Sequence, residues 1–85
     1  MVDFTVVESL ITSRIKDAVV KITDLTGGGD HLGIFVASDE FADKILIDRH
    51  QMIMDILSEK LKSGEIHAVQ LKTLTFEKAK AKGLL

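Results

Sequence analysis

The sequence contains no cysteine, and this absence removes several classes of function at once. Without a thiol the chain forms no disulfide and no thiolate metal site from its own residues. Cysteine-based zinc fingers, thiol redox catalysis and cysteine nucleophiles are therefore excluded.

Aromatic residues are scarce, and proline is absent. The only aromatic residues are four phenylalanines, whereas surfaces that stack several bases need several exposed rings. The formal net charge is −2, so the surface as a whole does not attract polyanions. A role with nucleic acid would need a local basic patch.

Long apolar runs are also missing. No stretch approaches the roughly 18 residues of a membrane span. The acidic start, Met1-Val2-Asp3, lacks the basic region of a signal peptide. We therefore expect a cytoplasmic protein without membrane association, folded as a single domain over residues 1–85.

Residues 45–62 carry the clearest pattern, which predicts one amphipathic helix. At about 100° per residue, its apolar side chains fall on one face. These are Leu46, Ile47, Ile53, Met54, Leu57 and Leu61. Asp43 is the predicted N-cap, and Gly64 is the predicted stop. The alternation over residues 66–74 then predicts a strand.

The N-terminal half predicts a helix and a β-hairpin. A capping box that starts at Thr5 opens a helix that ends near residue 15. Two segments, residues 18–23 and 32–37, are rich in residues that favour strands, and a glycine-rich loop joins them. This pattern predicts two strands. Within the first strand, Ala18, Val20 and Ile22 are predicted to face inward.

A polar bend and a terminal helix complete the predicted order. Phe41 is the expected packing anchor of the bend at residues 38–43, and residues 76–83 form a short terminal helix. The order helix, strand, strand, helix, strand, helix indicates an α+β fold with a three-stranded mixed sheet. Helices cover one face, and the other face stays open to a partner.

Three histidines are the side chains with the clearest chemical potential. His50 falls on the apolar side of the long helix, where a buried, hydrogen-bonded structural role is favoured over a ligand or base. His31 closes the glycine-rich loop and by itself is an ordinary loop histidine. His67 opens the third strand, where a ring fixed by the backbone suits a metal ligand as well as a plain polar strand end.

Other chemical signatures are weak. The glycine-rich loop precedes a strand and lacks a following Lys-Ser/Thr pair, which excludes a phosphate-binding loop. No histidine pair has zinc spacing, and no serine has a nucleophile-elbow context. Four lysines are candidates for a small basic patch. They are Lys72 and, near the C-terminus, Lys78, Lys80 and Lys82.

Taken together, residues from about Ile15 to Thr75 show a resemblance to a known family. The motifs are the glycine-rich loop ending in Asp30-His31, the bend Ser38-Asp39-Glu40-Phe41, Arg49-His50 in the long helix, and Ile66-His67-Ala68 at the third strand. In this combination the chain resembles the BolA family.

That resemblance implies a class II KH-like fold and a non-enzymatic adaptor that pairs with a monothiol glutaredoxin of the Cys-Gly-Phe-Ser type. In such pairs a [2Fe–2S] cluster is shared between the glutaredoxin cysteine, a glutathione thiolate and nitrogen ligands of the BolA-like chain. The ligands implied here are His67 and, from the loop, His31. The implied role is iron–sulfur trafficking or iron and redox regulation, including stress responses, with no cofactor when the chain is alone.

The resemblance also carries an alternative, a KH-like regulator of transcription that binds DNA. Lys72, Lys78, Lys80 and Lys82 would then form its contact surface. The Gly-Xaa-Xaa-Gly loop that clamps nucleic acid in KH domains is missing between the helices. We expect a monomer when the protein is alone, with weak homodimerisation as the alternative.

Overall fold

The computed structural model describes residues 2–85, and its elements follow the predicted order. They are α1 (Phe4–Arg14), β1 (Val19–Asp24), β2 (His31–Ala37), the 3-10 helix η1 (Asp39–Phe41), α2 (Leu46–Ile56), α3 (Ser58–Lys62), β3 (Ala68–Leu74) and α4 (Phe76–Ala81). The predicted α+β class is confirmed.

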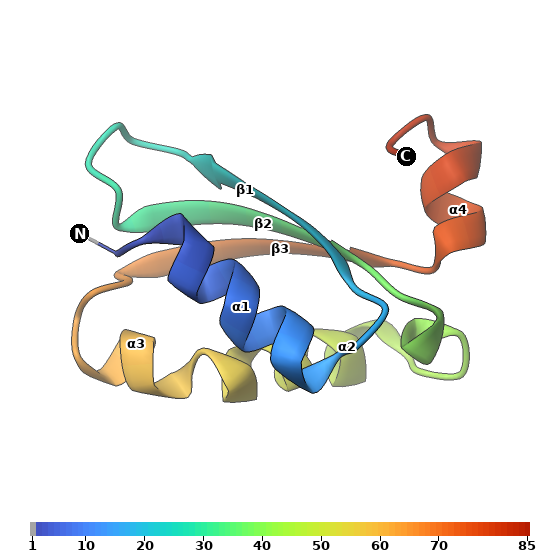
Figure 1. Cartoon of the computed structure of the whole chain (residues 1–85), viewed down its shortest axis with the longest axis horizontal. Helices are drawn as coiled ribbons and strands as arrows, with labels where there is room; N and C mark the ends of the chain where they lie inside the picture. The colour runs from blue at the N-terminus through green and yellow to red at the C-terminus, as the bar shows by residue number, and fades with distance from the viewer. Residues whose placement is uncertain (1) are drawn as a thin grey trace.

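The three strands form one mixed sheet in the order β1-β2-β3. β1 runs antiparallel to β2, and β3 runs parallel to it. The connection from β2 to β3 therefore crosses the sheet, and it contains α2 and α3. Figure 1 shows α1, α2 and α3 on one face, while α4 stands beyond the end of β3.

The core lies between the sheet and the helices on its covered face. The central strand β2 supplies Leu32, Ile34 and Val36, all buried, and Ala18, Val20 and Ile22 pack against the same core as predicted. Full burial of one such aliphatic side chain is worth about 1.5–3 kcal/mol. Phe41 is 1% exposed, which confirms it as the anchor of the bend.

Both predicted N-caps were wrong. Asp3 caps α1, because its carboxylate accepts from the Thr5 backbone N–H at 2.9 Å and from the Thr5 hydroxyl at 2.6 Å. Thr5 thus lies inside the helix. α2 begins only at Leu46, with Ile45 as N-cap and no side-chain cap bond, so Asp43 lies before the cap.

The long helix is divided at Leu57, where φ is −92° and ψ is 4°. The helical hydrogen bonds continue across this point. Leu57 N–H donates to Ile53 O at 3.0 Å, and Leu61 N–H donates to Leu57 O at 3.0 Å. Leu57 is fully buried. α2 and α3 therefore behave as one helix with a local irregularity.

The predicted apolar face is buried in its later turns but not in its first. Leu46 and Ile47 are 56% and 69% exposed, so their predicted place in the core was wrong. Within residues 2–85, α2 is hydrogen-bonded to β3 only after this turn, where Arg49 Nε donates to Thr73 Oγ1 at 3.1 Å. No described residue buries the turn before it. The period of the apolar residues predicts which side of a helix is apolar. It does not predict which turns of that side pack against another element.

The third strand begins two residues later than predicted, at Ala68. Ile66 is buried and its N–H donates to Lys60 O at 3.1 Å, so it closes the turn after α3 instead of pairing with β2. Within the described chain, every helix is too short or too polar to cross a lipid bilayer.

One polar contact fastens the link after α1 to the end of β2. Ser38 is fully buried, and its hydroxyl donates to Asp17 Oδ1 at 2.5 Å. The Asp39 backbone N–H donates to Asp17 Oδ2 at 3.0 Å. The Ser38 hydrogen bond, aided by the Asp39 N–H, lowers the pKa of Asp17 below its usual value of 3.8.

Replacing Asp17 with asparagine should therefore destabilise the fold in a pH-dependent way. A carboxylate with a lowered pKa stabilises the folded state above its unfolded pKa, and the benefit is lost as the pH falls through the folded value. We expect a loss of about 1 kcal/mol at pH 7, or a melting temperature lower by about 4–8 °C. Thermal melts should show a smaller difference at pH 3, and an equal difference at both pH values would contradict this account.

Candidate metal-ligand cluster

The parallel pairing of β2 and β3 brings two distant histidines to one end of the sheet. Parallel strands begin at the same edge, so the start of β2 lies beside the start of β3. His31 is the first residue of β2 and pairs with Ala68 in the register. His67 directly precedes β3, and so it lies next to the glycine-rich loop that leads into β2.

Asp30 joins the two segments through its backbone. Its carbonyl accepts from the His67 N–H at 2.7 Å and from the Ala68 N–H at 3.3 Å. These bonds hold the residue before His31 against the residue before β3. The backbone of His67 is thus held in place independently of its side-chain contacts.

The side chains of Asp30, His31 and His67 form one cluster, which we call the His-Asp cluster. His67 Nδ1 lies 2.7 Å from Asp30 Oδ2, and His31 Nε2 lies 4.0 Å from Asp30 Oδ1. The imidazole ring centroids are 6.0 Å apart and the rings are nearly perpendicular, at 88°. One ligand atom from each residue lies within 4.8 Å of the others.

The turn before His67 is rigidly built. Gly64 has φ +81°, a conformation that suits glycine after a helix, and a Cβ there would lie 3.9 Å from His67 Nε2. Glu65 forms an ion pair with Lys60 at 3.3 Å and accepts from the Ser63 hydroxyl at 3.2 Å. Both contacts lower the pKa of Glu65, and the contact with Lys60 has the larger effect.

The cluster faces solvent. The side chains of His67 and His31 are 58% and 42% exposed, and that of Asp30 is 28% exposed. Because a carboxylate only accepts, the 2.7 Å contact requires a proton on His67 Nδ1. In the neutral ring Nε2 then carries a free lone pair. This is how metal-binding histidines are commonly held, with one nitrogen on a carboxylate and the other on the metal.

The donor set suits a transition-metal ion. Imidazole nitrogens suit iron, copper and zinc, and in some [2Fe–2S] clusters two histidines replace two thiolates on one iron. The chain brings two such nitrogens together at an exposed edge and has no cysteine to supply the remaining ligands. Any thiolate ligand at this site would have to come from another molecule.

The structure brings together the two histidines singled out in the sequence, His31 and His67. Asp30 was missed as their companion. It stands directly before His31, but that position was not informative while the parallel pairing of β3 with β2 was unknown. The third histidine, His50, is only half-buried, and among residues 2–85 its buried Nε2 has no hydrogen-bond partner, so the predicted hydrogen bond is absent there.

The candidate lysines are spread over two surfaces. Lys72 lies on the uncovered face of the sheet, in a pocket without the other three. Lys78 lies on α4 and lines a different pocket with Lys44 and Arg49. Lys80 and Lys82 are exposed at the end of α4.

Comparisons with known proteins agree on one family. The family model described as BolA-like protein matches residues 8–78. Protein BOLA2 of Arabidopsis thaliana is 37% identical over 67 residues, which cover 78% of this chain and 70% of that protein.

Solved structures give the same result. A crystal structure of a bol-like protein from Babesia bovis has a TM-score of 0.81 at 28% identity and covers 98% of this chain and 95% of its own. The BolA domain of SufE1 from Arabidopsis thaliana has a TM-score of 0.78 at 25% identity, with 87% and 92% covered.

The Asp30 contact predicts the tautomer of His67. In the native protein, two-bond ¹H–¹⁵N correlation spectra at pH 8 should show a neutral ring with the proton on Nδ1. In Asp30→Ala the acceptor is gone, and the ring should revert to the tautomer mixture of a free imidazole. An identical His67 pattern in both proteins would show that the carboxylate does not orient the ring.

Proposed function

The chain belongs to the BolA-like protein family, and from this membership we propose that it is a non-enzymatic adaptor that shares a [2Fe–2S] cluster with a monothiol glutaredoxin. The glutaredoxin cysteine and glutathione would supply thiolates, and His67 and His31 would supply nitrogen ligands. The observation that carries the proposal is the exposed His-Asp cluster, whose ligand atoms lie within 4.8 Å of one another.

The ligand chemistry supports a shared site. Iron–sulfur clusters are usually held by thiolates, and this chain has none to offer. Replacing two thiolates by two neutral imidazoles removes negative charge from the cluster and so raises its reduction potential. A chain with histidines and no cysteine therefore changes a partner's cluster but does not hold one by itself.

Each residue of the His-Asp cluster has its own part in this proposal. Asp30 holds the Nδ1 proton of His67 and so leaves Nε2 free to bind iron. His31 Nε2 lies 4.0 Å from Asp30 Oδ1, beyond hydrogen-bond distance, so the carboxylate does not fix this ring as it fixes that of His67. The exposure of both rings lets the glutaredoxin approach without unfolding the chain.

A transfer or regulatory role fits this site better than catalysis. The His-Asp cluster contains no hydroxyl or thiol that could act as a nucleophile, and its two histidine side chains are exposed to solvent. The nucleic-acid alternative has less support, because Lys72 and Lys78 line separate pockets. We therefore propose a role in iron–sulfur trafficking or in iron and redox regulation.

Anaerobic mixing with a cluster-loaded monothiol glutaredoxin tests this proposal. Visible circular dichroism should change on mixing with the native chain, because nitrogen ligands replace thiolates. His67→Ala should abolish the new spectrum, and His31→Ala should alter it. Asp30→Ala should weaken formation of the mixed species by about 10- to 100-fold, as expected when a partner of a ligating histidine is lost.

His50→Gln is the matched control, since His50 lies in α2 outside the His-Asp cluster. It should give the native spectrum, provided that far-ultraviolet circular dichroism shows an intact fold. A new spectrum that survives in His67→Ala would overturn the ligand assignment. No change with the native chain would overturn the adaptor proposal itself.

A further inference from the structure

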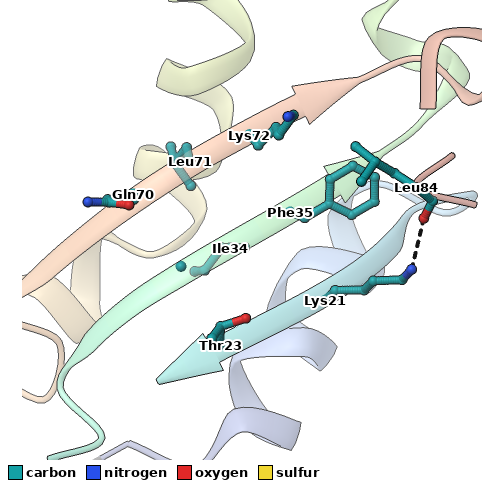
Figure 2. Close-up of a pocket in the computed structure, with 9 residues that line it drawn as sticks. Lys21, Thr23, Ile34, Phe35, Gln70, Leu71, Lys72 and Leu84 are labelled. Carbon is teal, nitrogen blue, oxygen red and sulfur yellow. Dashed lines mark hydrogen bonds between the residues drawn. The ribbon is translucent and has the colours of Figure 1, made fainter. Parts of the chain in front are cut away.

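The uncovered face of the sheet carries a pocket that the His-Asp cluster does not use. We call it the open-face pocket (Figure 2). It has a volume of about 480 Å³ and is lined mainly by side chains of all three strands. The residues on which the argument rests are Lys21, Thr23, Gly33, Phe35, Gln70 and Lys72.

These residues form two rows across the sheet. Lys21 pairs with Phe35, which pairs with Lys72, so an aromatic ring on the central strand has a lysine on either side. In the next row Thr23 pairs with Gly33, and Gly33 pairs with Gln70. Paired residues on neighbouring strands project to the same face, so both rows point into the pocket.

The pocket is locally basic although the chain is acidic overall. The sequence has 13 acidic and 11 basic residues, yet no described residue that lines the pocket carries a carboxylate. Lys21 Nζ lies 5.8 Å from the centroid of the Phe35 ring and donates to Leu84 O at 2.8 Å. An ammonium group has three N–H bonds, so two remain for an anion.

Gly33 creates the hollow next to the aromatic ring. A Cβ at this position would lie 3.3 Å from Leu25 Cδ2, so a larger residue would crowd Leu25 and fill the space. Thr23 and Gln70, on either side, offer a hydroxyl and an amide that donate and accept hydrogen bonds. Leu84 closes one end beside Phe35 (Figure 2).

We propose that the open-face pocket binds a free nucleoside phosphate. The phosphates pair with Lys21 and Lys72, the base packs against Phe35, and Thr23 and Gln70 meet its polar edge. The volume lies within the range of about 300–1,000 Å³ for small-molecule sites. Among the described residues that line the pocket, Phe35 is the single aromatic ring, which serves one base, whereas a nucleic-acid strand needs a ring for each of several bases.

Titration of ¹⁵N-labelled protein with ADP tests the proposal. Amide shifts should be saturable and centred on Lys21, Gly33, Phe35 and Lys72. Adenosine has the base without the phosphates, and pyrophosphate has the phosphates without the base. Each should bind at least about ten-fold more weakly than ADP. Phe35→Leu and the variants Lys21→Met and Lys72→Met should each weaken ADP binding by about five-fold or more, since a stacked base or a charged hydrogen bond is lost.

Lys16→Met is the matched control, because it removes the same charge outside the pocket. It should leave the affinity for ADP unchanged. Equal weakening in Lys16→Met, absence of shifts, or shifts confined to the His-Asp cluster or α4 would overturn the proposal. Binding of an eight-nucleotide single strand at this pocket more than ten-fold tighter than ADP would overturn the choice of occupant.

Discussion

The parallel pairing of β3 with β2 is the constraint on which the rest of the structure depends. It forces the chain between these strands to cross the sheet, and it therefore places α2 and α3 on one face and leaves the other open. It also aligns the starts of the two strands. There the Asp30 carbonyl accepts from both His67 and Ala68 N–H groups, and its carboxylate holds the His67 ring. One pairing thus builds the core and the His-Asp cluster together.

The same sheet separates two chemically different surfaces. The His-Asp cluster lies at the edge where β2 and β3 begin, offers two imidazole rings beside a carboxylate and could hold a metal ion. The open-face pocket lies across the middle of the strands, offers two ammonium groups beside Phe35 and suits an anion. Neither surface needs an enclosed cavity, which suits a chain of 85 residues with a small core.

The sequence predicted the order of elements and the inward residues of the hairpin, because burial imposes periods that are visible in any amphipathic segment. It failed where a partner element decides the outcome. Leu46 and Ile47 have the right period, but no described residue covers them. Asp3 caps α1 in place of Thr5, because its carboxylate accepts a hydrogen bond from the Thr5 N–H. His67 and His31 were singled out as histidines in suitable places and through the family motif, and the structure brings them together. Asp30 was missed because only the strand pairing shows that it touches His67.

Pulsed electron paramagnetic resonance of the reduced mixed cluster tests the central claim most directly. The sample pairs this chain, labelled with ¹⁵N-histidine, with an unlabelled monothiol glutaredoxin loaded with cluster. If His67 and His31 ligate the iron, two ¹⁵N couplings of directly bound imidazole nitrogens will be seen, and one will disappear in His31→Ala, the variant in which the mixed cluster still forms. Absence of any ¹⁵N coupling in a formed complex would contradict the account, because it would mean that the cluster stays with the glutaredoxin alone.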